Sequence, residues 1–146
     1  MHVRQQIREA VAVLVTGLVT TQARVFSSRI YPVSADDLPC LLIYSTSEQS
    51  EVDGMGNARP LYRTLIINVE ALASANTDLD DTLDTISVEV ETALAADRKL
   101  GGLAITSTLA QTEITLKADG ESTVGSIRLS YEIEYRTTDK NPETTT

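Results

Sequence analysis

The chain has 146 residues, 21 of them acidic against 12 Lys or Arg, and its formal net charge is -9 with one cysteine and no tryptophan. This length suits one domain that buries a hydrophobic core. The negative charge argues against nonspecific binding of nucleic acid or an anionic membrane, the few aromatic rings argue against base-stacking sites, and a single cysteine excludes an internal disulfide.

The first predicted element is an amphipathic helix over residues 2–18. Its apolar residues recur at intervals of three and four, the spacing of a helix with one buried face. No stretch of the chain approaches the roughly 18 unbroken apolar residues of a membrane span, so we expect no membrane association. The apolar face consists of Val3, Ile7, Val11, Leu14 and Leu18.

Two strands and a loop are predicted next. A short strand over 24–29 ends at a polar, proline-containing stretch, and residues 38–45 form a nearly continuous apolar run that is typical of a strand covered on both faces. Cys40 lies in this run, where we expect a buried, inert thiol. Residues 45–60 are polar, acidic and glycine-bearing, which favours a long mobile loop, and loops of this length are usually functional.

Residues 61–72 resume strand character and are followed by the best-marked helix of the chain. Thr77 is the predicted N-cap, and aspartates occupy the first turn, where the helix dipole favours negative charge. Gly101 and Gly102 are expected to stop the helix. Its apolar stripe consists of Leu79, Leu83, Ile86, Val90 and Leu94.

The strand predicted over 103–117 contains a fault. Its apolar residues hold odd positions up to Leu109 and even positions from Ile114 onward. Because side chains alternate along a strand, this change of phase requires a β-bulge near Ala110-Gln111. The last strand alternates without interruption, with apolar residues from Ile127 to Tyr135 on one face and charged or polar residues on the other.

These elements predict an α+β fold: a single mostly antiparallel sheet with two helices packed on one face, in the order α-β-β-β-α-β-β. We expect one domain over 1–136, containing the long loop 45–60. Residues 137–146 have no apolar side chain, which predicts a disordered C-terminal tail.

The sequence offers little for catalysis or for binding a cofactor or metal. The single histidine, His2, lies beside the first residue, a poor place for a catalytic base. The aspartates of the second helix lack the glycine and the final glutamate of a calcium loop. Glu132 and Glu134 share a strand face with arginines, so a charge ladder is favoured over a carboxylate pair for acid–base chemistry. We therefore expect no enzyme, no cofactor and no metal site.

With no candidate for catalysis, the functional feature left in the sequence is polar surface for contacts with partner proteins. The acidic loop and several arginines are candidates for contacts with a neighbouring copy of the chain. The alternative for any single residue is an ordinary solvated side chain. The candidate interface residues are Glu48, Glu51, Asp53, Arg59, Arg63, Arg24 and Arg29.

The order of four short segments resembles the lambda-like minor tail protein U family, the tail terminators of long-tailed bacteriophages. In that family an apolar strand entered through an aspartate and a proline ends in tyrosine, and the terminal strand has a tyrosine-x-isoleucine-x-tyrosine pattern. Cys40 stands here where small residues are usual, and the chain after Arg136 is an extension. The resemblance spans most of residues 3–136, and its segments are Ala23-Arg24-Val25-Phe26, Asp37 to Tyr44, Asp78 to Asp84, and Tyr131-Glu132-Ile133-Glu134-Tyr135.

The resemblance implies a structural virion protein at the head-proximal end of the tail, assembled in the host cytoplasm. It implies a hexameric ring that caps the tail tube, stops its polymerisation and provides the joining interface for a head-completion or neck protein. DNA passes through such a ring without specific binding, and an acidic lumen suits that passage. Two alternatives stay open: a head-completion or neck connector of the same virion, and a monomeric intracellular binding domain.

Overall fold

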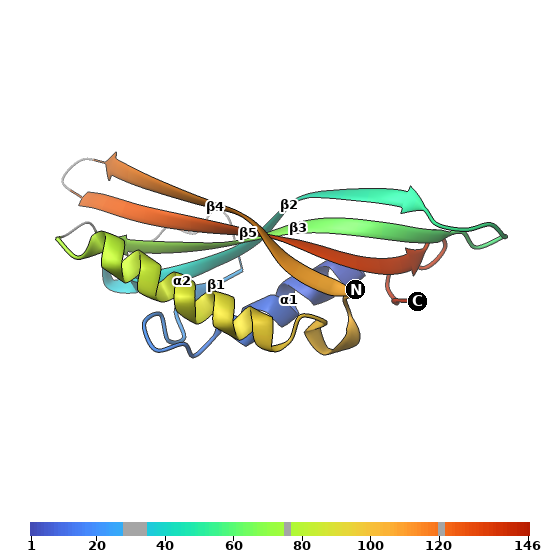
Figure 1. Cartoon of the computed structure of the whole chain (residues 1–146), viewed down its shortest axis with the longest axis horizontal. Helices are drawn as coiled ribbons and strands as arrows, with labels where there is room; N and C mark the ends of the chain where they lie inside the picture. Colours follow the sequence, from blue (N-terminus) through green and yellow to red (C-terminus); the bar gives the residue numbers. More distant parts are fainter. Residues whose placement is uncertain (28–34, 75–76, 120–121) are drawn as a thin grey trace.

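A single five-stranded sheet carries both helices on one face (Figure 1). The computed structural model describes residues 1–27, 35–74, 77–119 and 122–146. The predicted α+β class and the order of elements are confirmed. The elements are α1 (Val3–Val15), β1 (Val25–Phe26), β2 (Cys40–Val52), β3 (Pro60–Ser74), α2 (Leu79–Ala96), β4 (Thr106–Asp119) and β5 (Ser122–Thr138), with short 3-10 helices at Ala35–Asp37 and Leu100–Gly102.

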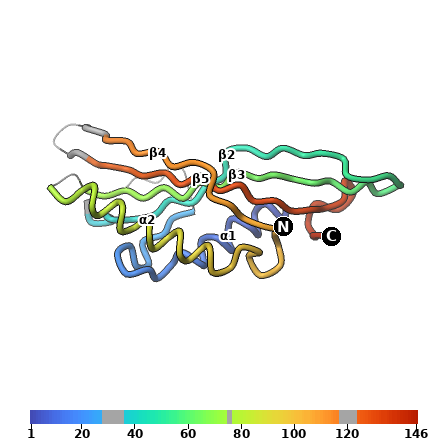
Figure 2. Tube along the Cα trace, in the orientation of Figure 1, coloured from blue at the N-terminus to red at the C-terminus, as the bar shows by residue number. Residues whose placement is uncertain are grey.

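The strands are arranged in the order β1-β2-β3-β5-β4. β1 pairs with β2 in parallel over two residues, and the other pairs are antiparallel. The sheet is longer than the helix layer, and the β2–β3 hairpin extends past the helices at one end, whereas at the other end α2 begins beside the ends of β4 and β5 (Figure 2). We call the sheet face that carries α1 and α2 the helix face, and the opposite face the distal face.

The core lies between the helix face and the two helices. Each helix contributes a stripe at helical spacing, and β3 and β5 contribute alternate residues, as their sequence patterns predict. The predicted buried face of β5 is confirmed from Ile127 to Tyr135. The largest fully buried side chains include Ile7 and Val11 of α1, Leu41 and Ile43 of β2, Leu65 and Ile67 of β3, Leu83 and Ile86 of α2, and Leu129, Ile133 and Tyr135 of β5.

Two local predictions about β4 and β2 are confirmed. The pairing of β4 with β5 changes register between Leu109 and Gln111, where the change of apolar phase requires a bulge. Cys40 is fully buried in a small apolar cluster on the distal face, together with Leu42 and Leu72. Burial disfavours the thiolate and raises the pKa of Cys40 to about 11, so the thiol is inert near neutral pH.

The predicted long loop over 45–60 is wrong. β2 continues through this segment to Val52, pairs with β3 along its whole length, and leaves only residues 53–59 as the turn. A bulge between Ser45 and Ser47 shifts the register. The segment lacks apolar alternation because Glu48, on the helix face, meets charged partners there rather than an apolar core. Backbone pairing with β3 holds this stretch as a strand.

The predicted disordered tail over 137–146 is also wrong. β5 extends to Thr138, and the side chain of Thr137 is fully buried. A backbone bridge between Thr138 and Asn141 turns the chain back, and the amide of Val3 donates to the carbonyl of Pro142 at 2.9 Å. Hydrogen bonds hold this segment, and a composition without apolar residues gives no sign of them.

The predicted helix ends need smaller corrections. α1 begins at Val3 and ends at Val15, within the predicted range 2–18. The N-cap position of α2 is Asp78 and not Thr77, and its side chain makes no capping hydrogen bond. Of the strand predicted over 24–29, Val25–Phe26 is observed, and residues 28 and 29 lie outside the described residues.

Candidate assembly surfaces

The seven predicted interface residues fall into different environments. Glu48 and Arg63 have side chains only 9% and 11% exposed, and Arg24 is half-buried. Glu51, Asp53 and Arg59 are exposed at the end of the β2–β3 hairpin, and Arg29 lies outside the described residues. The structure therefore does not gather these residues into one surface, and their interface role stays a prediction.

Glu48 is the centre of a charged cluster inside the folded chain. Its Oε1 lies 3.0 Å from a guanidinium nitrogen of Arg63 and 3.0 Å from one of Arg4, and its Oε2 accepts a hydrogen bond of 2.5 Å from the hydroxyl of Tyr135. Arg63 also donates from Nε to the hydroxyl oxygen of Thr137 at 2.9 Å. The cluster joins α1, β2, β3 and β5, so Glu48 and Arg63 have their partners within the chain.

Tyr135, which binds Glu48 through its hydroxyl, is fully buried. Burial raises the pKa of its hydroxyl well above the ordinary value, and the neighbouring carboxylate of Glu48 raises it further. The guanidinium of Arg63 stands over the ring, 6.0 Å from its centroid, which is at the limit of a cation–π contact. The cluster is thus a structural joint, with its tyrosine held protonated.

Arg24 anchors the connection between α1 and β2. Its Nε donates to the carbonyl of Pro39 at 2.8 Å, and a terminal nitrogen donates to the carbonyl of Thr20 at 3.0 Å. Thr20 is itself bound through its amide and hydroxyl to the carboxylate of Glu89 in α2. These contacts assign Arg24 a structural role within the chain.

The end of the β2–β3 hairpin is a polar arm with an exposed apolar tip. Nε of Arg136 donates to the carboxylate of Asp53 at 2.7 Å, and both side chains are well exposed. The side chains of Met55 and Val52 are 98% and 59% exposed. Arg59 is held through its backbone, which exchanges hydrogen bonds with Asp139, so its charged group is available to a partner.

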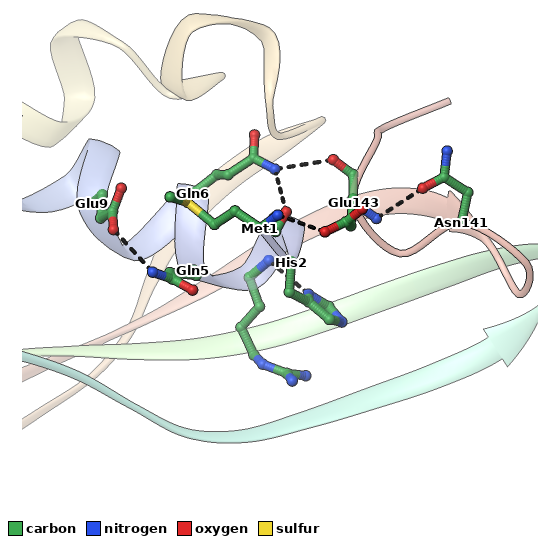
Figure 3. Close-up of polar contacts among 8 residues, drawn as sticks. Met1, His2, Gln5, Gln6, Glu9, Asn141 and Glu143 are labelled. Atoms are coloured by element: carbon green, nitrogen blue, oxygen red, sulfur yellow. Dashed lines mark hydrogen bonds and ion pairs between the residues drawn. The ribbon is translucent and has the colours of Figure 1, made fainter.

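The two ends of the chain meet, as Figure 3 shows. The N-terminal ammonium lies 2.6 Å from the carboxylate of Glu143, and the amide of Gln6 donates to the carbonyls of Met1 and Glu143 at 2.8 and 3.0 Å. His2 caps α1 by accepting the amide of Arg4 at its Nδ1, 3.0 Å away. Burial, together with the nearby Arg4, lowers the pKa of His2, which favours the neutral, accepting imidazole at this cap.

The distal face is polar over its middle part. Asn68 is buried there although polar, because its amide nitrogen donates to Thr46 at 3.0 Å and its oxygen accepts from Ser130 at 2.7 Å. An open hollow of about 440 Å³ lies here, and Thr46, Asn68 and Ser130 are among its lining residues. Strand register places more carboxylates than guanidinium groups on this face: Glu51, Glu70, Glu113, Glu132 and Glu134 against Arg128 and Arg136.

Several of these charged groups are paired across strands. Arg128 of β5 forms an ion pair with Glu113 of β4, and Arg136 stands 5.2 Å from the ring centroid of Tyr62. A hydrogen bond to Glu134 raises the pKa of the Tyr62 hydroxyl. Glu132, in contrast, is exposed and has no ion pair among the described residues. The surplus negative charge of the face therefore points to solvent.

β4 forms one edge of the sheet and is poorly covered by the helices. α2 lies over β3 and β5 and touches β4 little. Ile114 and Leu116, which share the helix face by register, are consequently 62% and 65% exposed. An open groove of about 580 Å³ separates the C-terminal half of α2 from β4, with Leu94, Leu109 and Tyr131 among its lining residues. Exposed apolar side chains on an edge strand mark a contact surface.

Sequence reasoning recognised the charge ladder of β5 but missed most of this surface. The polar and charged side chains of the distal face come from four strands, so the sequence of any one strand does not show that they form a surface. The even-numbered phase of Ile114 and Leu116 is visible in the sequence, but their exposure depends on where α2 lies.

The side chains that can bind a metal are dispersed: within the described ranges, no three His, Cys, Asp or Glu side chains cluster. Neither described helix is long and apolar enough to span a membrane.

Comparison with known proteins points to one family. The chain matches the family described as phage minor tail protein U over residues 2–135, which include both helices and nearly all of the sheet. Among solved structures it is similar to a chain of the "Virion of native gene transfer agent (GTA) particle", with 12% identity, a TM-score of 0.38, and coverage of 93% of this chain and 92% of that one. A search of curated proteins found no match. With its model matched over nearly the whole chain, the phage minor tail protein U family is the one to which this protein belongs.

Proposed function

We propose that this protein is a tail terminator: a subunit of a hexameric ring that caps the tail tube, stops its polymerisation and offers a surface to the head-completion protein. The observation that carries the proposal is the family match over residues 2–135. The fold supports it, because the exposed features of the described residues are edges, an arm and a polar sheet face suited to protein contacts.

The mechanism is assembly by mass action and geometry. A ring closes when two different patches of each subunit bind with a fixed rotation between neighbours. One face of the closed ring then binds the last layer of tube subunits, and no further tube subunit adds. The other face is left for the neck.

We further propose that the distal face lines the central hole. In this arrangement α1 and α2 lie outside, and the carboxylate excess of the distal face, including Glu132 and Glu134, faces the DNA. A negatively charged wall repels phosphate groups, so DNA passes without being bound. Replacing Glu132 and Glu134 by Lys is expected to slow DNA passage while rings still form, which a comparison of DNA ejection from complete particles would measure.

The deciding experiment is the length of tails made without the protein. Lysates from which it is removed should contain tails of undefined, excessive length. Tails of normal length that fail to join heads would instead identify a neck connector. Electron microscopy of the purified protein beside tail tubes provides the second readout, since a chain that stays monomeric there would support the alternative of a monomeric binding domain.

A further inference from the structure

We infer that neighbouring subunits join edge to edge, the β4 edge of one copy pairing with the β2 edge of the next. The inference rests on the proposed ring and deepens it by naming the two surfaces that bind each other. Three features of the described residues carry it: the two free edges, their composition and their relative direction.

Both ends of the sheet offer backbone groups for pairing. β4 stands at the end of the sheet order, and no strand in the described part of the chain pairs with its outer side. Among the described residues, β1 pairs with β2 at Leu41 and Leu42, and no strand pairs with the outer side of β2 from residue 46 to 52. An unpaired strand edge exposes a row of amides and carbonyls that another strand can satisfy.

Neither free stretch, 106–116 of β4 or 46–52 of β2, carries lysine or proline, and the one inward-pointing charge, Glu48, already has a counter-charge in Arg63. Monomeric proteins place lysine, proline or inward-pointing charge on edge strands. Between Thr106 and Leu116, β4 has one charged residue, Glu113, and that residue is paired with Arg128. The free part of β2 turns Glu48 inward to Arg63 and otherwise consists mostly of Ser, Thr and Gln. Both edges are therefore available to a second strand without a clash of charge.

The directions of the strands favour a neighbour related by rotation. β2, β3, β5 and β4 are antiparallel in succession, so β4 runs opposite to β2. Rotation about a ring axis keeps each strand's direction along that axis, and β4 of one copy therefore meets β2 of the next in antiparallel fashion, the slightly more stable pairing. The two edges differ, as a closed ring requires. Pairing of β4 with β4 would give a two-fold dimer instead.

The rows of the sheet predict which residues meet. Thr108 of β4, Glu132, Ile66 and Ser47 of β2 form one row across the subunit on the distal face. A rotation without translation continues this row, so Thr108 lies near Ser47 of the next copy, or near Gln49 if the strands are tilted. Ile114 and Leu116, exposed on the helix face of the same edge, then border the joint.

Engineered disulfides test this arrangement in the full-length protein. Within one subunit Thr108 and Ser47 are separated by three strand spacings, about 14 Å, which is too far for a disulfide. The double variant Thr108→Cys with Ser47→Cys, or with Gln49→Cys, should give on mild oxidation of the ring a covalent ladder that rises to the complete ring. The single variants and the unmodified chain, whose Cys40 is buried, should give none.

The outcomes separate this inference from the proposed function. Rings that form and control tail length but crosslink at neither pair overturn the edge-to-edge joint alone. A Thr108→Cys single variant that gives covalent dimers overturns it in favour of a two-fold contact. A full ladder from a chain that has no effect on tail length supports the joint and overturns the terminator function. A chain that stays monomeric beside tail tubes overturns both.

Discussion

At the scale of single residues, Glu48 shows how a polar segment can be an integral part of a sheet. Its carboxylate binds groups from three other elements, Arg4 of α1, Arg63 of β3 and Tyr135 of β5. Two of these partners are almost fully buried. Such a cluster tolerates loss of its central charge poorly, because the guanidinium left behind stays in a dry site.

We predict that Glu48→Gln lowers the free energy of unfolding by about 3 kcal/mol, since it leaves the buried Arg63 without a counter-charge. Glu51→Gln, an exposed position on the same strand, should change the free energy of unfolding by no more than about 0.5 kcal/mol. Urea denaturation of both variants measures the difference. Equal losses in the two variants would contradict a special role for Glu48.

The buried thiol and phenols predict lower stability at alkaline pH. Burial raises the pKa of Cys40 to about 11 from 9.0 and that of Tyr131 to about 12 from 10.0. The unfolded chain therefore loses these protons first, so the stabilisation is complete below pH 9 and is lost as pH rises through 11 and 12.

Between its unfolded and folded pKa, each group costs at most about 1.4 kcal/mol per pH unit. Denaturation midpoints at neutral pH and at about pH 10.5 should show the fall. The variant Cys40→Ala should flatten the first part of the slope, from pH 9 upward. A midpoint that rises over this range would show that the side chains are not buried in their neutral forms.

At the scale of elements, the apolar pattern of β4 predicts its bulge but does not predict how exposed its side chains are. The change of apolar phase locates the bulge between Leu109 and Gln111, because alternation along a strand is a local rule. Register places Ile114 and Leu116 on the helix face, yet both are exposed. Their environment depends on the position of α2, which lies over β3 and β5 instead.

The contact between α2 and β5 predicts a sensitive glycine. A Cβ on Gly125 would lie 2.5 Å from Cδ2 of Leu79, so in Gly125→Ala the Leu79 side chain has to leave its position, or the start of α2 has to move with it. We expect it to lower the free energy of unfolding by about 1–3 kcal/mol.

The variant Leu79→Ala frees that space and provides the control. The double variant should therefore lose less stability than the sum of the two single variants, as thermal or urea denaturation of the set would measure. Strict additivity would mean that the two residues do not touch.

At the scale of the whole molecule, the C-terminal segment connects the ends of the chain. It binds the amide of Val3 through Pro142 and the N-terminal ammonium through Glu143, and Asp139 binds the backbone of Arg59 near the arm. A segment that a composition argument treats as disordered thus holds the start of α1 and the base of the arm in one place.

Deletion of residues 139–146 should loosen the start of α1. The exchange rate of the Val3 amide is expected to rise by about tenfold, the equivalent of one lost hydrogen bond, as hydrogen exchange would measure. Glu143→Gln, which removes only an exposed ion pair, should leave this rate nearly unchanged. Equal protection in the truncated chain would restore the view that the segment is an independent tail.

The local patterns of the sequence alone determined the class of fold, both helices, the buried face of β5, the bulge in β4 and the burial of Cys40. Each of these follows from apolar periodicity or from a single residue type, and hydrophobic burial imposes such periodicity wherever an element has one covered face. The resemblance to minor tail protein U, now confirmed as membership of that family, rests on the order of the same elements.

Only the tertiary structure decided the course of residues 45–60 and 137–146 and the places of Glu48 and Arg63. These depend on hydrogen bonds and ion pairs between residues far apart in the chain, as between Glu48 and Tyr135. A polar side chain that will be buried against a partner has the same local sequence signature as one that will face water. Its environment is settled only when the strands align, because the partner that offsets its desolvation comes from another element.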